Sequence, residues 1–310
     1  MKRCFSYISL FGDVLLSLSL LVVSCEKKEP GIDLPDRSPY EEVDLQKYPK
    51  AGEIKIISFN VRYGTAKESN SSNNWQYRKA ACVSMIKDQK PSCIGFQEAV
   101  YDLQFKYFLE ELKDEYDGFG VGRDDGKEKG ECMGILYRKS EIKKIDGGTF
   151  WLSPTPDTPS KADVWDAACF RSATWGIFEV IATGKRFCYI NTHLDHKGAT
   201  ARSESMKLIG ERFKKYNPDG FPQFLSADFN ASPSSSIFKN LPLMFNSREH
   251  APTGHSDQIS TYNAWGGGSG LIDNILFSKA TTVEYHTIIE PYESVAYLSD
   301  HYPIYAIFSL

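Results

Sequence analysis

The sequence lacks an excess of basic residues, cysteines at paired spacings, and internal repeats. Lys and Arg number 36 against 40 Asp and Glu, and the resulting net charge of −4 argues against tight non-specific binding to nucleic acid. The seven cysteines include no Cys-x-x-Cys pair. Five of them, an odd number, follow Cys25, which argues against a disulfide framework and against zinc. Without a repeat, solenoid architectures are excluded.

A long apolar run is missing as well. The most apolar stretch, residues 10–23, is interrupted by Asp13 and is too short and too weakly flanked for a stable membrane span. It follows the basic pair Lys2 and Arg3 and leads into small residues and Cys25. This layout is that of a secretory signal. It resembles a bacterial lipoprotein signal, in which Cys25 is lipidated, although an ordinary signal peptide with an incidental cysteine is the alternative.

Three segments are therefore expected along the chain. Residues 1–24 are predicted to be a lipoprotein signal peptide, and residues 25–50, rich in charge and proline, an envelope tether. Residues 51–310 show no break in composition and are expected to form one domain. Loss of the first 24 residues removes two positive charges and one negative charge, so the net charge moves from −4 to −5. We expect a monomer, lipid-anchored at a bacterial cell envelope and facing either the periplasm or the outer surface.

Alternating and helical apolar patterns predict many strands and three longer helices. The helices are expected at 75–89, 99–112 and 199–216, the second with Leu103, Phe105 and Phe108 inside. Strands are expected at 53–59, 92–97, 132–137, 143–151, 174–181, 185–192, 222–227, 271–278, 282–288 and 302–310. This order favours an α/β fold of two packed, mixed β-sheets covered by helices.

Polar side chains stand at the ends of several predicted strands. A buried carboxylate or amide of this kind requires a cation or hydrogen-bond partners. Oxygen ligands without cysteine favour Mg²⁺, Mn²⁺ or Ca²⁺ over zinc. The pattern therefore predicts a metal-assisted phosphoryl-transfer site. The residues at these ends are Asn60, Glu98, His193, Asp195, Asp228, Asn230, Asp273, Asp300 and His301.

One carboxylate and two histidines carry most of this prediction. Glu98 ends an apolar run and is expected to bind a cation, although a solvent-exposed end or a helix cap is the alternative. His193 and His301 each follow a strand, and Glu131 and Asp273 are their expected carboxylate partners. Two imidazoles across a metal site supply one proton acceptor for water and one donor for the leaving oxygen.

Six short blocks of sequence resemble the motifs of the endonuclease/exonuclease/phosphatase superfamily, and they occur in the same order as in that family. Together they span roughly residues 53–310. The resemblance implies a four-layer α/β sandwich and a metal-dependent phosphoric ester hydrolase, with this domain at residues 51–310. The blocks are Ile56-Ile57-Ser58-Phe59-Asn60, Gly95-Phe96-Gln97-Glu98, Tyr189-Ile190-Asn191-Thr192-His193-Leu194-Asp195, Ser226-Ala227-Asp228-Phe229-Asn230, Leu271-Ile272-Asp273 and Ser299-Asp300-His301-Tyr302-Pro303.

The resemblance also implies roles by position. Glu98 would be the main ligand of Mg²⁺, or of Mn²⁺, with Asn60 beside it and Asp300 near the metal. Hydrolysis would proceed by in-line attack of water on a phosphorus ester. Five residues are expected to carry the catalysis: the acid–base pair of histidines, a carboxylate that polarises the second of them, and two residues that orient the water and a phosphate oxygen. They are His193, His301, Asp273, Asp228 and Asn230.

Four further residues are expected to contact the substrate or its phosphate. Glu131 matches the place where deoxyribonuclease-like members hold a carboxylate against the first histidine, and Asn191 shares a strand face with His193. Arg62 is expected either to grip a phosphate or to form a structural ion pair with a metal-site carboxylate. Arg171 opens a strand and is expected in the pocket.

The substrate stays open between classes. The family cleaves nucleic acids, inositol phosphates, sphingomyelin and other phosphodiesters, and its motifs do not separate these. The acidic charge, the absence of a basic arm, and Arg62 in place of an acid found in abasic-site endonucleases favour a small or non-DNA phosphate ester. A metal-dependent nuclease is the second reading, and a catalytically silent ligand-binding lipoprotein the third. A loop with Trp265 and three glycines is expected either to shape the pocket or to be a flexible hairpin.

Overall fold

Two six-stranded sheets form the centre of the domain in the computed structural model, which describes residues 46–310. The first sheet has the order β13-β14-β1-β2-β6-β4 and the second β11-β12-β10-β9-β8-β7. The strands of the first sheet are β1 (Glu53–Asn60), β2 (Cys93–Gln97), β4 (Tyr116–Phe119), β6 (Ile135–Arg138), β13 (Thr281–Thr287) and β14 (Ile304–Ser309). Those of the second are β7 (Ile142–Trp151), β8 (Ser172–Val180), β9 (Arg186–His193), β10 (Gln223–Asp228), β11 (Phe245–Asn246) and β12 (Asp273–Ser278).

Both sheets are mixed, and one parallel pair at the centre of each matters for function. β1 runs parallel to β2 in the first sheet, and β9 runs parallel to β10 in the second. The carboxyl ends of parallel neighbours lie at the same edge of a sheet. The antiparallel pairing of β10 with β12 places Asp228 opposite Asp273. Residues far apart in the chain are thus delivered to one edge.

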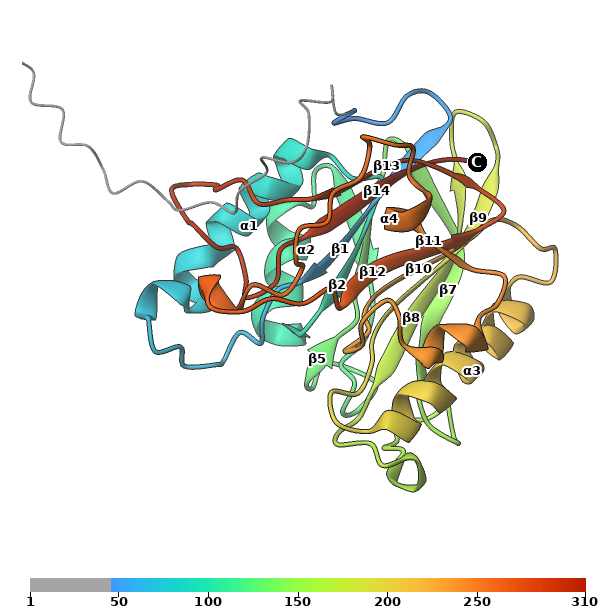
Figure 1. Cartoon of the computed structure of the whole chain (residues 1–310), viewed down its shortest axis with the longest axis horizontal. Helices are drawn as coiled ribbons and strands as arrows, with labels where there is room; N and C mark the ends of the chain where they lie inside the picture. The colour runs from blue at the N-terminus through green and yellow to red at the C-terminus, as the bar shows by residue number, and fades with distance from the viewer. Residues whose placement is uncertain (1–45) are drawn as a thin grey trace, which may run out of the picture. The chain divides into compact units, whose positions relative to one another are not determined.

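Helices cover the outer face of each sheet, as the order of predicted elements indicated. α1 (Trp75–Gln89) and α2 (Lys106–Glu111) lie beside the first sheet, and α3 (Ala199–Tyr216) lies beside the second (Figure 1). The short helices are η1 (Ser71–Asn73), η2 (Tyr101–Phe105), η3 (Asp163–Trp165), η4 (Ser236–Asn240), α4 (Ser247–His250) and η5 (Ala264–Gly266). Residues 46–310 belong to one compact unit.

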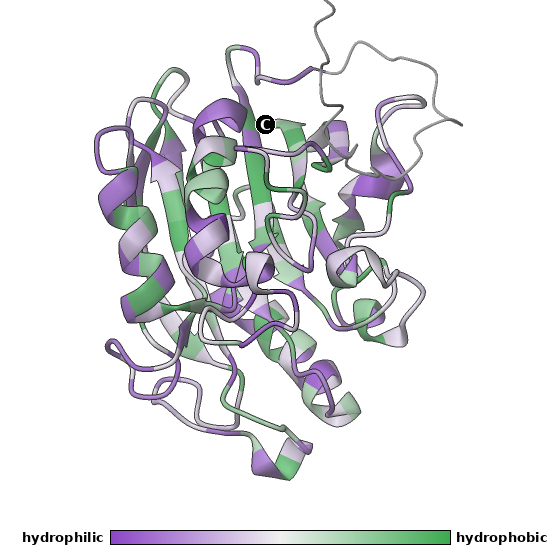
Figure 2. Cartoon of the chain, turned by 90° about the vertical axis from the view of Figure 1, so that its left-hand side faces the viewer, coloured by the Kyte–Doolittle hydropathy of each residue, from purple (hydrophilic) through white to green (hydrophobic). Residues whose placement is uncertain are grey.

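Side-chain alternation along the strands explains the layers. On β1, Ile54 and Ile56 point into a core between the sheets, whereas Ile57 and Phe59 point into a second core under α1 and α2. A third core joins α3 to the other sheet. The strands are correspondingly hydrophobic, and the helices alternate hydrophobic and hydrophilic residues (Figure 2). Burial on both faces drives the sheets together. The predicted four-layer α/β sandwich is confirmed.

The segment predicted as a helix over 99–112 is organised differently. Ala99–Val100 forms the short strand β3, paired with β5 (Glu131–Cys132), and the helix begins with the π-helical turn η2. Leu103, predicted inside, is 41% exposed, whereas Gln104 is buried. The Gln104 side chain accepts hydrogen bonds from the backbone of Gly64 and Val100 and donates to the carbonyl of Arg62. These backbone groups need hydrogen-bond partners, and for this reason Gln104 and not Leu103 faces inward.

Two other outcomes concern the ends and the edge strands. The strand β4 was not predicted, because its four residues, Tyr116–Phe119, include a glycine and an aspartate. The predicted signal peptide, the lipidation site at Cys25 and residues 25–45 of the predicted tether lie outside the described residues, whereas residues 46–50 of the tether are described. Among the helices of residues 46–310, none has the length and apolar content needed to cross a membrane.

Lys55 supplies a test of the buried layer between α1 and the first sheet. Its side chain is fully buried, and its Nζ lies 3.8 Å from the centre of the Tyr305 ring. The Nζ donates to the carbonyl of Lys47 at 2.8 Å and to Gln89 Oε1 at 2.7 Å. Burial lowers the pKa of Lys55 to about 7, against the smaller opposing effect of Glu284.

We therefore expect the folded state to become more stable as the pH rises and Lys55 loses its proton. Between pH 7 and the ordinary lysine pKa of 10.5, the unfolded chain binds a proton that the folded chain does not. Stability then rises with pH, by at most about 1.4 kcal/mol per pH unit, and Lys55→Met removes this slope. Urea unfolding of both proteins at pH 7, 8 and 9 measures it. A stability difference that stays constant with pH contradicts the expectation.

Candidate active site

The cavity that holds the predicted residues lies where the two sheets meet at one edge. It has a volume of about 520 Å³. Strand ends of the first sheet supply Arg62 and Glu98, and those of the second supply His193 and Asp228. The full lining is Arg62, Glu98, Arg123, Glu131, Cys169, Arg171, His193, His196, Asp228, Asn230, Tyr262, Ile272, Asp300 and His301. Most of the predicted site residues therefore share one cavity.

Asn60 links the two sheets at the floor of this site. Its Nδ2 donates to Glu98 Oε1 at 3.1 Å and to Asp228 Oδ2 at 3.0 Å. Its Oδ1 accepts a hydrogen bond from the backbone nitrogen of Arg62 at 3.0 Å. Asn60 was predicted to offer its oxygen to a metal. Here its amide nitrogen instead joins two carboxylates, because the turn after β1 occupies the oxygen.

Three site residues adopt left-handed backbone conformations that non-glycine residues seldom use. The φ angles are +61° at Arg62, +60° at Glu98 and +47° at Asn230. Such conformations carry a steric cost, and they persist where surrounding contacts fix them. Asn230 is fixed by a bond from its backbone nitrogen to Asp228 Oδ1 at 2.9 Å. Glu98 is fixed through its Oε2, which accepts from the nitrogen of Tyr63 at 2.7 Å.

The two histidines differ in electrostatic environment. His301 Nδ1 lies 2.9 Å from Asp273 Oδ2, which is the predicted partner. Burial alone lowers the pKa of His301, but Asp273, with Asp228 and Asp300, outweighs it and raises the pKa to about 10. His301 is therefore protonated at neutral pH.

His193 has the opposite tendency. Burial, followed by the charges of Arg171 and Arg123, lowers its pKa well below the ordinary value. Its Nε2 accepts a hydrogen bond from Asn230 Nδ2 at 2.9 Å, as a neutral imidazole can. One oxygen of Asp228 lies 3.4 Å from His193 Nε2 and 3.8 Å from His301 Nε2. Asp228 thus stands between a neutral and a charged imidazole.

The expected partnership between Glu131 and His193 is not formed. Glu131 Oε2 instead accepts from Arg123 Nη1 at 2.7 Å. His193 Nδ1 is buried and has no hydrogen-bond partner among residues 46–310. The prediction was wrong because the sequence gives no sign that Arg123 folds back over β5. Glu131 still lines the cavity, but its charge is directed at a guanidinium.

The buried carboxylates fit a hard divalent cation. Glu98, His193 and Asp228 form one group whose ligand atoms lie within 4.8 Å of one another, and Asp228, Asp273 and His301 form another. Burial, and then the neighbouring Asp273, raises the pKa of Asp228 to about 7. Carboxylates that crowd in this way are stabilised by a cation. Each group combines two carboxylates with one imidazole and has no thiolate, so Mg²⁺ or Mn²⁺ suits the site better than a soft metal.

Asp300 and Arg62 form an ion pair at the rim. Arg62 Nη1 lies 3.3 Å from Asp300 Oδ2, and Arg62 Nε donates to Glu68 Oε1 at 2.8 Å. Burial raises the pKa of Asp300, and Glu98 adds to the effect. Asp300 belongs to neither group of close ligand atoms. Of the two alternatives given for Arg62, this arrangement matches the structural ion pair with a carboxylate. The guanidinium nevertheless lines the cavity.

Other predicted residues have supporting positions. Asn191 is buried; its Nδ2 donates to the carbonyl of Phe96 at 2.8 Å, and its Oδ1 accepts from Gln97 Nε2 at 2.7 Å. It therefore ties β9 to β2 and does not line the cavity. Trp265 Nε1 reaches Glu68 Oε2 at 3.3 Å, so the Trp265 loop contacts the Arg62 network. Asp195 fixes the turn before α3, accepting hydrogen bonds from the backbone nitrogens of Lys197 and Gly198.

Sequence reasoning missed several lining residues. Tyr262 packs edge-on to the His301 ring with ring centres 5.0 Å apart. Arg123 and His196 also face the cavity. None stands at the end of an apolar strand, so the signal used for the other residues did not find them. His196 lies three residues after His193, and that spacing was the one available hint.

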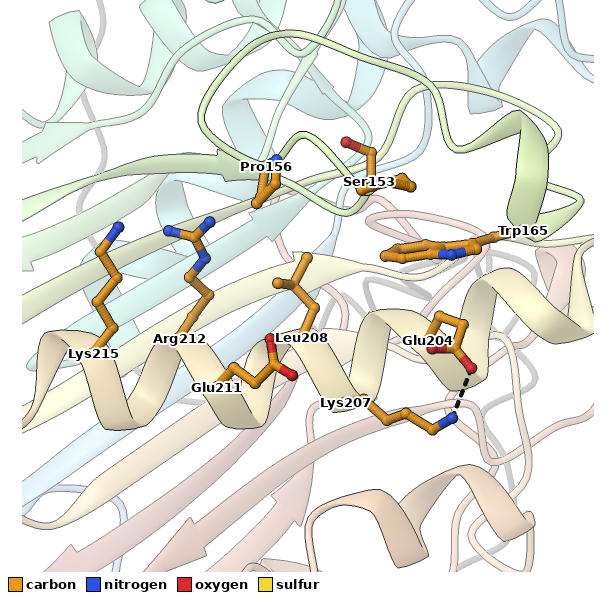
Figure 3. A pocket seen from close by; sticks show the side chains of 10 residues that line it. Ser153, Pro156, Trp165, Glu204, Lys207, Leu208, Glu211, Arg212 and Lys215 are labelled. Atoms are coloured by element: carbon orange, nitrogen blue, oxygen red, sulfur yellow. Dashed lines mark hydrogen bonds and ion pairs between the residues drawn. The ribbon is translucent and has the colours of Figure 1, made fainter.

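A second pocket, of about 410 Å³, lies between α3 and the segment that follows β7 (Figure 3). Four of its charged side chains form ion pairs, two of them with a residue outside the lining. Glu204 binds Lys207 at 2.7 Å, and Arg212 binds Asp157 at 2.9 Å. The pocket holds none of the predicted catalytic residues, so the chemistry is assigned to the cavity between the sheets.

The sequence from residue 57 to residue 301 matches the model of the Endonuclease/Exonuclease/phosphatase family. The chain belongs to this family. The match contains four of the six motif blocks whole, most of the first and last blocks, and all residues that line the cavity. The predicted membership is confirmed, and family members are phosphoesterase hydrolases.

Solved structures of the Endonuclease/Exonuclease/phosphatase family resemble the whole domain. The endonuclease/exonuclease/phosphatase from Bacteroides vulgatus is 33% identical, with 83% of this chain and 99% of that chain covered and a TM-score of 0.74. The mannosyl-6-phosphatase of Bacteroides thetaiotaomicron is 30% identical, with 83% and 100% covered and a TM-score of 0.76. An uncharacterized protein of Acanthamoeba polyphaga mimivirus is 27% identical over 184 residues, 57% of this chain and 67% of that protein.

Cation binding is expected to stabilise the fold through the carboxylate groups. With Mg²⁺ or Mn²⁺ at about 100 times its Kd, the free energy of unfolding should rise by about 2.7 kcal/mol over the EDTA-treated protein. Glu98→Gln should remove most of this gain, because it takes one charged ligand from the site. Thermal melting with and without metal measures the effect. Glu211→Gln on α3 is the matched control, and an equal metal response in all three proteins contradicts the assignment.

Proposed function

We propose that this protein is a divalent-cation-dependent phosphoesterase that acts on a small, non-DNA phosphate ester, with Mg²⁺ as the cation. The observation that carries the proposal is the position of Asp228. It lies within 3.8 Å of both histidines and accepts a hydrogen bond from Asn60. One carboxylate thus connects the acidic residues of the first sheet with the Asp273–His301 pair of the second. Membership of a family of phosphoesterases supports this reading.

The mechanism follows from the protonation states of the site. Glu98 and Asp228 would hold the cation, which when bound offsets negative charge on the phosphoryl oxygens. Neutral His193 carries its lone pair on Nε2, which faces Asn230 Nδ2, and is suited to accept the proton of an attacking water that takes the place of that contact. Protonated His301, held by Asp273, is suited to donate a proton to the leaving oxygen. Asn230 Nδ2 donates to His193 Nε2 at 2.9 Å and to the carbonyl of Leu194 at 3.0 Å, and so holds the His193 ring in place for this step.

A sugar phosphate is the substrate class that we favour. The mannosyl-6-phosphatase of Bacteroides thetaiotaomicron is 30% identical over 83% of this chain, and its name describes hydrolysis of a phosphate monoester of a hexose. The cavity of about 520 Å³ offers room for an organic group beside the phosphate. The net charge of −4 disfavours the alternative of a nuclease, which would need attraction to a polyanion.

Turnover assays on the protein in Mg²⁺ and in EDTA test this function. We expect Mg²⁺-dependent release of phosphate from hexose phosphates. Asp228→Asn and His301→Gln should each lower kcat by about 10²–10⁴-fold, because each removes a group that acts in the transition state. Glu204→Gln, in the second pocket, should keep full activity. Near-full turnover in either site variant contradicts the mechanism.

The same assays separate the remaining alternatives. Nicking of plasmid DNA without hydrolysis of any small ester would support a nuclease. Absence of metal-dependent hydrolysis of hexose phosphates, p-nitrophenyl phosphate, bis-p-nitrophenyl phosphate, nucleic acids, sphingomyelin and inositol phosphates would support a silent ligand-binding protein.

We also propose that the enzyme acts at a bacterial cell envelope through a lipid on Cys25. The basic start, the apolar residues 10–23 and the small residues before Cys25 support this. Full-length protein expressed in a bacterial host should partition into the detergent phase of a Triton X-114 separation. Cys25→Ser should shift it to the aqueous phase. Equal partitioning of both proteins contradicts lipidation.

A further inference from the structure

Two arginines and a histidine line the cavity beside the catalytic residues and have no part in the mechanism above. We call Arg123, Arg171 and His196 the arginine subsite. Arg123 donates to Glu131 at 2.7 Å, and Arg171 Nη2 lies 3.0 Å from His196 Nδ1. The three side chains come from separate segments of the chain, and all of them line the cavity of about 520 Å³.

The donor capacity of the arginine subsite is not used up by the protein. The Nε atoms of Arg123 and Arg171 are buried without a hydrogen-bond partner among residues 46–310. Arg171 is only 6% exposed, so water does not solvate it freely. Burying a guanidinium donor without a partner is costly. An anionic ligand would remove that cost.

The carboxylate nearest to Arg171 is a weak partner for it. Asp195 Oδ2 lies 3.6 Å from Arg171 Nε, beyond hydrogen-bond distance. Both Asp195 oxygens are already engaged by backbone nitrogens, those of Ala168 at 2.9 Å, Lys197 at 2.9 Å and Gly198 at 2.8 Å. The charge of Arg171 is therefore only partly compensated.

A metal is the wrong ligand for this place, although three potential ligand residues meet there. Cys169, Asp195 and His196 offer atoms within 4.8 Å of one another. The guanidinium of Arg171 already occupies the side of His196 Nδ1 and would repel a cation. Burial raises the pKa of the Cys169 thiol, which keeps it protonated. A cation is therefore disfavoured here, and the unpaired Nε atoms of the two arginines leave donors for an anion.

The arginine subsite is close to the reaction centre. Arg123, Arg171 and His196 line the same cavity as His193, Asp228 and His301. An anion bound there would thus belong to the same small molecule whose ester is cleaved, or to the scissile phosphate itself. Elsewhere in the cavity the positive charges are already matched, Arg62 by Asp300 and His301 by Asp273, so a second anion is best placed at the arginines.

We propose that the arginine subsite binds a second anionic group of the substrate, so that the enzyme prefers small phosphate esters with an additional phosphate or carboxylate. This rests on the proposed phosphoesterase function. A guanidinium binds both groups through paired, charge-assisted hydrogen bonds, which a neutral sugar hydroxyl does not match. The subsite therefore sets specificity, and the histidines and the cation site perform the chemistry.

The kinetic test compares glucose 6-phosphate with glucose 1,6-bisphosphate and 6-phosphogluconate. The wild type should show a kcat/KM at least about tenfold higher for the two doubly anionic esters, mainly through KM. Arg171→Met should lower that preference about tenfold or more, and Arg123→Met should lower it in the same direction. Arg186→Met, which removes a guanidinium on the exposed surface of β9, is the matched control and should keep the wild-type preference.

Three results would overturn the proposal. One is equal kcat/KM for singly and doubly anionic esters in the wild type. Another is equal loss with all three esters in Arg171→Met, which would place Arg171 on the scissile phosphate. The third is an unchanged preference in both arginine variants. Thermal melting checks that each variant is folded, and Arg171→Lys, which keeps the charge, should retain part of the preference.

Binding separates this proposal from the proposed function. Isothermal titration calorimetry of wild-type protein in EDTA with methylenebisphosphonate should give binding that Arg171→Met weakens about tenfold and Arg186→Met leaves unchanged. That result in a protein that hydrolyses no ester would support the anion subsite and contradict the phosphoesterase function. Hydrolysis of hexose phosphates with equal bisphosphonate affinity in the three proteins would support the function and contradict the subsite.

Discussion

The contact on which the site depends is the pair of hydrogen bonds that Asn60 donates to Glu98 and to Asp228. Glu98 directly follows β2 of the first sheet, and Asp228 is the last residue of β10 in the second. One amide group therefore fixes the distance between the sheets at their functional edge. Two parallel strand pairs bring these ends together, and the core between the sheets holds them in register. The chemistry is thus set by the packing of two layers, which no local sequence segment determines.

Negative and positive side chains lie in different parts of the cavity that results. Glu98, Asp228, Asp273 and Asp300 crowd negative charge at the sheet edge, and burial raises the pKa of Asp228 and Asp300. Arg123 and Arg171 place positive charge beside His193. The negative charge of Asp273 raises the pKa of His301, whereas burial and the positive charges of Arg171 and Arg123 lower the pKa of His193. The two imidazoles therefore differ in protonation. A symmetrical pair of histidines becomes an acceptor and a donor through its neighbours.

Much of this was predictable from the sequence, for a physical reason. Apolar strands that end in a polar residue reveal both the strand and the residue that reaches the edge, so Glu98, Asp228 and the Asp273–His301 pair could be named. Contacts made by loops could not. Glu131 accepts a hydrogen bond from Arg123 and therefore does not contact His193. Gln104 points inward and donates to the backbone carbonyl of Arg62. The Asn60 side-chain oxygen accepts from the backbone nitrogen of Arg62, which orients its amide. Each depends on loop geometry that has no periodic signal.

The left-handed backbone at Arg62, Glu98 and Asn230 has a consequence for how this protein can change. At all three positions glycine would relieve steric strain but would also remove the side chain and its hydrogen bonds, so relief of strain and retention of the site are opposed there. Selection that acted on this backbone strain alone would therefore remove side chains at the very positions that form the site. A side chain retained at such a position records selection for activity, and an inactive descendant of this fold should reveal itself by glycine there.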